Sequence, residues 1–173
     1  LFRNVRTSKD DWQFDDVTQA TGLDANNQRY SFAASWEDFD NDRDLDLYVA
    51  NDFGRDNLYR NDAGTFTDIA ADVGAEDSGS GMAITWGDYD RDGWMDAYVS
   101  NMFSAAGRRI SAQPGFMPDA PQLVRRRLRR FARGNTLLKN AGGRSFIDRA
   151  SLEGVEVGRL AWSSNFCDLN NDG

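Results

Sequence analysis

The stretch DFDNDRDLD at residues 38–46 decides the fold expected for this chain. It recurs as DYDRDGWMD at residues 88–96 and begins again as DLNNDG at residues 168–173. Oxygen-bearing side chains occupy positions 1, 3, 5 and 9 of the nine-residue pattern, and a tight turn with that spacing directs them toward one centre. Hard cations such as calcium take about 6–8 oxygen ligands. The pattern therefore predicts calcium-binding loops.

The candidate ligands are the carboxylate and amide side chains at these positions. Without a cation they would repel, by about 4 kcal/mol for two unit charges 4 Å apart at an effective dielectric of 20. The ligands are Asp38, Asp40, Asp42 and Asp46 in the first loop, Asp88, Asp90, Asp92 and Asp96 in the second, and Asp168, Asn170 and Asp172 in the third.

Acidic stretches of this kind also occur as solvated turns and in EF-hands. Asp and Asn favour turns in general, but three copies in one register favour a metal site. An EF-hand needs a bidentate Glu at position 12, where this chain has Val49 and Val99. Gly93 supplies the glycine expected at position 6, whereas the first loop has Arg43 there, so we expect that loop to be strained or differently shaped.

Composition excludes several classes of site. The 173-residue chain contains no His, which removes Ser-His-Asp and Cys-His catalysis and His-ligated metal centres. Its single cysteine, Cys167, cannot form an internal disulfide. No apolar run approaches the roughly 18 residues of a membrane-spanning helix, so no transmembrane segment is expected.

Other sequence motifs recur together with the acidic loops. Leu-x-Arg/Lys-Asn motifs begin at Leu58 and Leu137, with a related LFRN at residues 1–4. A Phe follows each motif, and a Gly stands eight residues after each Phe, at Gly22, Gly74 and Gly154. The segments flanking the loops alternate with a period of two, which is typical of strands. Each repeat therefore predicts four short strands.

Repeated four-stranded units indicate an all-β chain that forms a partial β-propeller of about three blades. We expect half a blade at residues 1–18, a blade at 30–70, a blade at 80–149 with an insertion at 102–134, and a partial blade at 157–173. Because propellers close with about 4 to 8 blades, the chain is expected to be a fragment of one domain that packs on further blades. The large residues before each loop, such as Phe32 and Trp36, are expected in the core between sheets rather than in a ligand cage.

The stretches WEDFD through DLYVAN and WGDYD through DAYVSN resemble the FG-GAP/VCBS repeats, the calcium-binding propeller repeats of integrin α-subunit heads. The chain looks most similar to bacterial ASPIC/UnbV-type proteins that are similar to cartilage acidic protein. The resemblance implies that the backbone carbonyls of Asp44 and Trp94 are ligands at position 7. It also implies a secreted, periplasmic or cell-surface location, where calcium is abundant.

The insertion predicts a loop at residues 104–118 and then a helix, with Asp119 as its N-cap and Gly134 as its stop. A basic helix can bind nucleic acid, an anionic membrane or an acidic partner. Alternatively, its apolar stripe packs on the propeller while its arginines neutralise an acidic body of net charge −8, which is the interpretation favoured here. The stripe consists of Leu123, Val124, Leu128 and Phe131, and the arginines are Arg125, Arg126, Arg127, Arg129, Arg130 and Arg133.

These features predict a non-enzymatic, calcium-stabilised scaffold for extracellular adhesion or interaction. Its partner, a protein or a glycan and not a nucleic acid, is expected on the face opposite the calcium loops. Alternatives are the propeller portion of a secreted hydrolase and a lectin-like sugar binder that uses Trp12 or Tyr30. Neither a Walker A motif nor a nucleophile elbow is present to favour the hydrolase.

Overall fold

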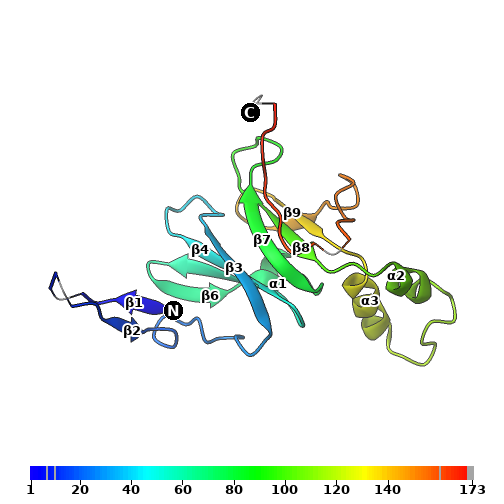
Figure 1. Cartoon of the computed structure of the whole chain (residues 1–173), viewed down its shortest axis with the longest axis horizontal. Coiled ribbons are helices and arrows are strands. Elements are labelled where there is room, and N and C mark those ends of the chain that lie inside the picture. Colours follow the sequence, from blue (N-terminus) through cyan, green and yellow to red (C-terminus); the bar gives the residue numbers. More distant parts are fainter. Residues whose placement is uncertain (7, 10, 160, 171–173) are drawn as a thin grey trace.

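The computed structural model describes residues 1–6, 8–9, 11–159 and 161–170. The protein is mostly β, with three small antiparallel sheets and a few short helices (Figure 1). This arrangement confirms the all-β class and is consistent with the blades expected from the repeats. None of the described helices has the length and apolar character needed to cross a membrane.

The first four-stranded sheet follows chain order, β3-β4-β5-β6, with each strand antiparallel to the next. Residues of high β propensity alternate along it, and a turn with positive φ at Ala63 and Gly64 joins β5 to β6. Its strands are β3 (Ser31–Glu37), β4 (Asp46–Asn51), β5 (Asn57–Asp62) and β6 (Thr65–Asp68).

The second four-stranded sheet repeats this order as β7-β8-β9-β10. Register is repeated too, since Trp36 pairs with Leu47 in the first sheet and Trp86 pairs with Ala97 in the second. Its strands are β7 (Gly81–Gly87), β8 (Asp96–Asn101), β9 (Thr136–Asn140) and β10 (Phe146–Asp148).

The remaining elements lie outside these two sheets. A two-stranded sheet pairs β1 (Phe2–Asn4) with β2 (Phe14–Asp16), and the single-turn helix α1 (Ala70–Val73) leads from the first large sheet toward the second. Helices α2 (Ala105–Ser111) and α3 (Gln122–Phe131) interrupt the second sheet between β8 and β9. After Asp148 the described residues form no strand, although Phe166 contacts Tyr98 at a ring-centroid distance of 6.3 Å.

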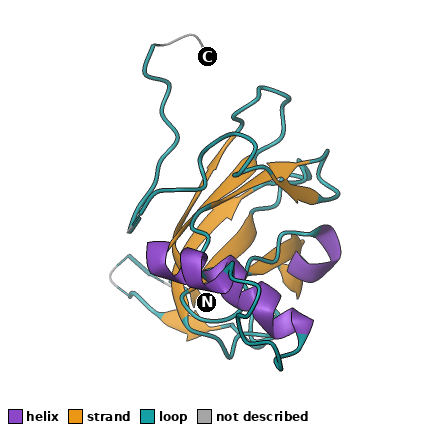
Figure 2. Ribbon diagram, turned by 90° about the vertical axis from the view of Figure 1, so that its right-hand side faces the viewer, coloured by secondary structure: helices purple, strands orange, loops and turns teal. Residues whose placement is uncertain are grey.

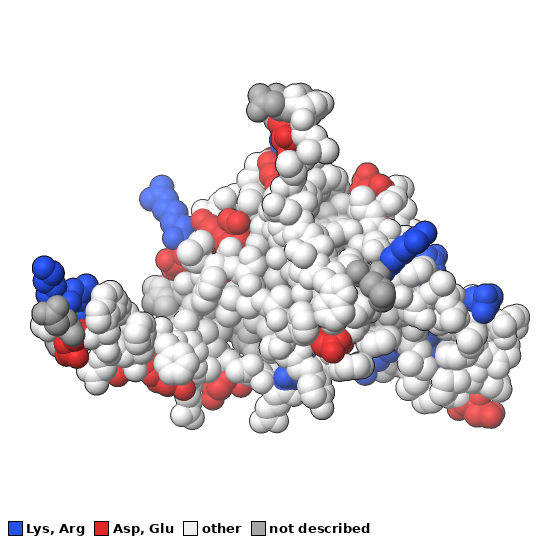
Figure 3. All heavy atoms as spheres, viewed as in Figure 1, with Lys and Arg blue, Asp and Glu red and all other residues white. Residues whose placement is uncertain are grey.

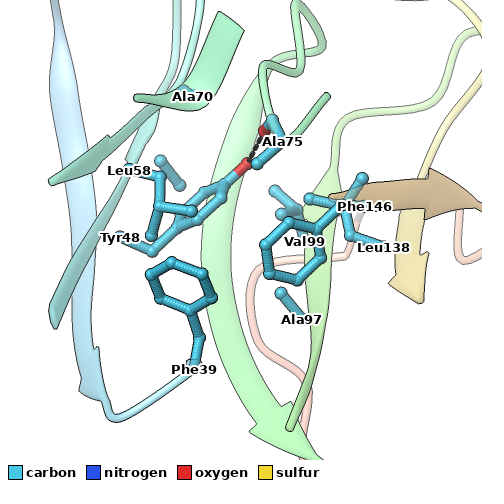
Figure 4. Packing of buried hydrophobic residues seen from close by; sticks show 10 residues of the cluster. Phe39, Tyr48, Leu58, Ala70, Ala75, Ala97, Val99, Leu138 and Phe146 are labelled. Carbon is cyan, nitrogen blue, oxygen red and sulfur yellow. Dashed lines mark hydrogen bonds between the residues drawn. The ribbon is translucent and has the colours of Figure 1, made fainter. Parts of the chain in front are cut away.

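The main hydrophobic core lies between the two large sheets (Figure 4). Tyr48 and Ala50 of β4 face Ala97 and Val99 of β8, and all four side chains are buried. Successive side chains in a strand point to opposite faces, so each sheet turns a different alternate set toward its neighbour. Burial of these apolar side chains is the main force that holds the two sheets together.

The expectation that the large residues before each loop lie in this core was right for the second sheet, where Met82 is buried and Trp86 packs against the core, and wrong for the first. Phe32 and Trp36 are 52% and 42% exposed, because their face of β3 points away from the second sheet. Leu47 and Val49 are also on the outer face of their sheet, where they pack against a smaller cluster. Alternation revealed two faces in each strand but not which of them meets the neighbouring sheet.

The recurrence of a glycine eight residues after each Phe has a structural cause. Gly22 and Gly74 have φ values of 85° and 75°, which disfavour any side chain. A Cβ atom at Gly22 would lie 2.6 Å from the Phe66 carbonyl oxygen, and one at Gly74 would lie 2.9 Å from that of Phe146. The repeated spacing of Phe and Gly therefore places the backbone of one repeat against the outer strand of the next.

The helices of the insertion differ from their prediction in extent and in capping. Residues 105–111, expected as loop, form α2, which is capped by the Ser104 hydroxyl. Helix α3 begins at Gln122 after Pro121 and has no side-chain cap, so Asp119 is not its N-cap. Proline itself suits a helix start, because its fixed φ is already helical and it has no N–H to leave unpaired.

The apolar stripe of α3 does not pack on the sheets as expected. Leu123, Val124 and Leu128 are 50%, 40% and 40% exposed. The helix is held instead by Arg130, which pairs with the buried Asp77, and by Phe131, which stacks on Phe53 at a centroid distance of 5.7 Å. The expected neutralisation of acidic groups by arginines thus occurs at particular buried and half-buried carboxylates.

Candidate metal centre

The two complete acidic stretches form equivalent hairpin loops. The first joins β3 to β4, and the second joins β7 to β8. Both loops lie at the same end of the paired sheets, while α2 and α3 lie at the opposite end (Figures 1 and 2). The repeat of strand–loop–strand therefore brings two acidic clusters to one surface.

Carboxylates at positions 1, 3 and 5 converge in each loop. One oxygen each from Asp38, Asp40 and Asp42 lies within 4.8 Å of the other two, and Asp88, Asp90 and Asp92 form the same arrangement. The six residues predicted from the 1-3-5 spacing are therefore grouped as expected. Such triads could bind a metal ion.

Backbone amides orient the first carboxylate of each triad. Asp38 accepts N–H bonds from Asp42 and Arg43 at 3.0 and 2.9 Å. Asp88 accepts the equivalent bonds from Asp92 and Gly93, also at 3.0 and 2.9 Å. The two loops therefore have the same local hydrogen-bond pattern despite different sequences.

Arg43 takes the backbone conformation of the glycine that it replaces. Its φ is 81°, compared with 89° at Gly93, and the residues two positions earlier, Asn41 and Arg91, both have φ of 60°. Of the two alternatives expected for the first loop, a different shape or strain, the structure therefore shows the same shape as in the second loop. The expectation of strain holds, because a non-glycine residue with positive φ is disfavoured.

Asp46 and Asp96, the candidate ligands at position 9, also have a structural role in their sheets. Both are fully buried. Asp46 accepts N–H bonds from Phe39 at 3.2 Å and Asn61 at 2.8 Å, while Asp96 accepts them from Tyr89 at 3.1 Å and Asn140 at 2.7 Å. Each carboxylate thus ties its loop to the third strand of its sheet.

The residues expected at position 7 follow the triads directly. The Asp44 N–H donates to Asp42 at 2.8 Å, and the Trp94 N–H donates to Asp92 at 3.0 Å. The Asp44 carboxylate accepts the Ala63 N–H at 2.8 Å, so its side chain is engaged by the β5–β6 turn. The ligation by the backbone carbonyls of Asp44 and Trp94 that the resemblance implies stays a prediction.

The third acidic stretch approaches the second loop. Asp168 and Asn170 line a cavity of about 510 Å³ together with Asp88 and Tyr89. Asp172 lies outside the described residues. The structure thus places the described part of this stretch beside the second triad.

Burial and mutual repulsion disfavour the charged form of several carboxylates. Burial, followed by the negative charges of Asp42 and Asp38, raises the pKa of Asp40. Burial also raises the pKa of Asp96, and it raises the pKa of Asp46 to about 7. Asp40 Oδ1 is in addition buried without a hydrogen-bond partner among the described residues. A divalent cation would stabilise the charged form and satisfy this oxygen.

Three residues with roles at the loops were missed by sequence reasoning. Lys139 binds Asp90 and lies 3.3 Å from Asp92, so it already neutralises part of the second triad. Asn140 donates to the carbonyls of Met95 at 3.1 Å and of Phe39 at 2.8 Å, and Asn61 donates to that of Leu45 at 3.0 Å. The recurring Arg/Lys-Asn dipeptide was the available signal, because its copies precede the same turn.

The pKa of Asp46 leads to a prediction for the metal-free protein. A carboxyl group whose pKa is raised in the fold contributes stability that is complete below its unfolded pKa, near 3.8, and is lost as the pH rises through about 7. We therefore expect the difference in melting temperature between the parent and Asp46→Asn to shrink from pH 5 to pH 8, measured calorimetrically in calcium-free buffer. A difference in melting temperature that stays constant or widens over this range would contradict the raised pKa of Asp46.

Comparison with known proteins agrees with this geometry. Residues 38–99 match the model of a family described as an FG-GAP-like repeat. The matched segment contains the whole of the first sheet after β3, both complete acidic loops, and β7. No curated protein matches the chain. Residues 38–99 are therefore an FG-GAP-like repeat, and both acidic triads lie within it.

Proposed function

We propose that this protein is a calcium-binding β-propeller scaffold with a non-enzymatic interaction role outside the cytoplasm. The observation that carries the proposal is the repeated triad. In each of two equivalent hairpin loops, three aspartate side chains bring their carboxylate oxygens together. Membership of the ASPIC/UnbV-type repeat proteins, which the sequence resembles, is part of this proposal.

The chemistry of the ligands favours calcium over other metals. Each cluster offers only oxygen atoms, and transition metals prefer sites that include nitrogen or sulfur. Magnesium demands near-octahedral geometry and keeps several waters, whereas calcium accepts irregular sets of carboxylates and backbone carbonyls. A hairpin loop with several carboxylates suits calcium best.

The proposed ions stabilise the fold at one end of the paired sheets. Calcium sites of extracellular modules have a Kd of about 10⁻⁴–10⁻³ M. Ligand present at 100 times its Kd adds about 2.7 kcal/mol to the free energy of unfolding for each site. The proposed location is secreted, periplasmic or cell-surface, where calcium is abundant enough to occupy sites of this affinity.

The test is a calcium titration of the parent protein and of a variant with Asp88→Ala and Asp92→Ala. We expect the variant to lose one binding event by calorimetry and a large part of the calcium-dependent rise in melting temperature. The matched control carries Asp15→Ala and Asp119→Ala, which remove the same charge from exposed positions away from the triads.

The control should titrate like the parent protein. An unaltered titration in the triad variant would remove the metal assignment, and so would an equal loss in the control. Turnover of chromogenic glycosides or phosphoesters by the parent protein would contradict the non-enzymatic part of the proposal.

We further propose that the partner, a protein or a glycan, binds at the end opposite the acidic loops. Helices α2 and α3 project from that end, near the turn between β4 and β5. Surface loops positioned by a rigid sheet are common sites of recognition.

A further inference from the structure

A cavity lined by arginines lies at the end of the molecule opposite the acidic loops. Its volume is about 480 Å³, and it lies between α3 and the segments around residues 55 and 76–78. Figure 3 shows basic side chains over the helical insertion at the right of the view. Six arginines line it: Arg55, Arg126, Arg127, Arg129, Arg130 and Arg133.

Only some of these positive charges are neutralised within the protein. Arg130 pairs with Asp77, Arg133 pairs with Asp148, and Arg55 lies 2.9 Å from Glu76. By contrast, Arg126 and Arg127 are exposed and make no hydrogen bond or ion pair with the described residues. The cavity thus carries unbalanced positive charge on a protein whose net charge is −8.

The helix that supplies this charge contains no acidic residue from Gln122 to Phe131. Arg126 stands three and four positions before Arg129 and Arg130, and like charges at these spacings repel. A sequence that served only to keep a helix in water would alternate positive with negative charges. The repulsion among these arginines, with no acidic residue between them, is therefore unfavourable for α3 alone, and a bound anion would relieve it.

Two of the arginines beside Arg126 and Arg127 are held in place by the protein. Arg130 is anchored to a carboxylate whose side chain is 1% exposed, and the Arg129 Nε–H donates to the Ser111 carbonyl at 2.8 Å. A guanidinium offers a planar fork that binds two oxygens of a phosphate or sulfate at once. Because Arg129 and Arg130 are already fixed, less conformational entropy is lost when an anion binds at the cavity.

We propose that this cavity binds an anionic oxyanion group, a phosphate or sulfate ester carried by the partner. Its size is within the range of about 300–1,000 Å³ that is typical of ligand pockets. The inference rests on the proposed interaction role and names the chemistry of the group recognised. A nucleic-acid duplex is disfavoured, because the positive charge is confined to one cavity of an acidic protein and does not form an extended stripe.

The test is calorimetric titration in calcium-free buffer at constant ionic strength. The probes are inorganic pyrophosphate, a sulfated disaccharide, and vesicles that contain phosphatidylglycerol. The variant carries Arg126→Gln and Arg127→Gln, and the control carries Arg109→Gln and Arg144→Gln, which remove the same charge outside the cavity. We expect saturable binding of at least one probe, weakened at least tenfold in the variant and less than twofold in the control.

The outcomes separate the possible sources of the oxyanion. Binding of the disaccharide assigns it to a glycan, and binding of the vesicles alone assigns it to a lipid headgroup. Arg126→Lys with Arg127→Lys keeps the charge but removes the forks, so we expect intermediate affinity. Absence of saturable binding to every probe, or equal weakening in variant and control, would overturn the proposal. Because calcium is absent from this experiment, its result is independent of the metal titration.

Discussion

Arg130→Met is expected to lower the free energy of unfolding by about 3–5 kcal/mol, the usual cost of removing one partner from a buried ion pair. Asp77 would be left buried among Thr136 and Asn101, which donate to it at 2.6 and 2.9 Å. For a protein of this size the loss corresponds to a decrease of roughly 6–20 °C in melting temperature. Urea denaturation and calorimetry measure both quantities.

The control is Arg126→Met, which removes an exposed arginine from the same helix and is expected to change stability by less than about 0.5 kcal/mol. An Asp77→Asn, Arg130→Met double variant should lose less than the sum of the single variants, because it leaves no unpaired charge. Equal effects of Arg126→Met and Arg130→Met would contradict the role of the buried pair.

The same pair predicts how stability depends on acid. Burial alone would raise the pKa of Asp77, but the Arg130 guanidinium and the hydrogen bonds from Thr136 and Asn101 outweigh burial and lower it. A carboxyl group with a lowered pKa contributes stability above its unfolded pKa, near 3.8, that is lost as the pH falls through its folded pKa. Arg130→Met removes the main cause of the lowering, so its acid unfolding should begin at higher pH than that of the parent.

Phe39→Ala is expected to lower the free energy of unfolding by about 3–5 kcal/mol, as is usual for a buried phenylalanine. Phe39 is 1% exposed, and its ring lies 5.6 Å from that of Phe146 in the core between the sheets. The residue follows the first carboxylate of its loop, so the acidic loop itself supplies part of the core. Chemical denaturation in calcium-free buffer measures the change without a contribution from metal binding.

Tyr89→Ala is the matched control, because Tyr89 holds the same position in the second loop but is only partly buried. We expect it to cost less than about 2 kcal/mol. Equal costs at the two positions would show that this core does not hold the sheets together as described.

Local features of the fold could be predicted from the sequence. These features depend on residues close together in the chain: the 1-3-5 spacing of aspartates, the period-two alternation on either side, and the recurring motifs. The two hairpins formed as expected. The convergence of Asp38, Asp40 and Asp42 follows from a tight turn and needs no distant partner.

Features set by tertiary packing could not be predicted in the same way. Tyr48 rather than Leu47 faces the second sheet, because the position of a neighbouring sheet is not encoded in one strand's alternation. The docking of α3 through Arg130 depended on Asp77, 53 residues earlier in the chain, whereas amphipathicity favoured its apolar stripe. Lys139 was overlooked for a similar reason, since its approach to Asp90 spans 49 residues.

The bond from the Asn140 side chain to the Phe39 carbonyl has a consequence for the behaviour of the two hairpins. It joins the second sheet to the first acidic loop, and the Asn41 side chain donates in return to the Gly93 carbonyl at 3.3 Å. We expect these bonds to couple the two hairpins, so that an ion bound at one triad favours an ion at the other, and this preference must be reciprocal. We therefore expect a single repeat excised from the chain to bind calcium more weakly than the two repeats together.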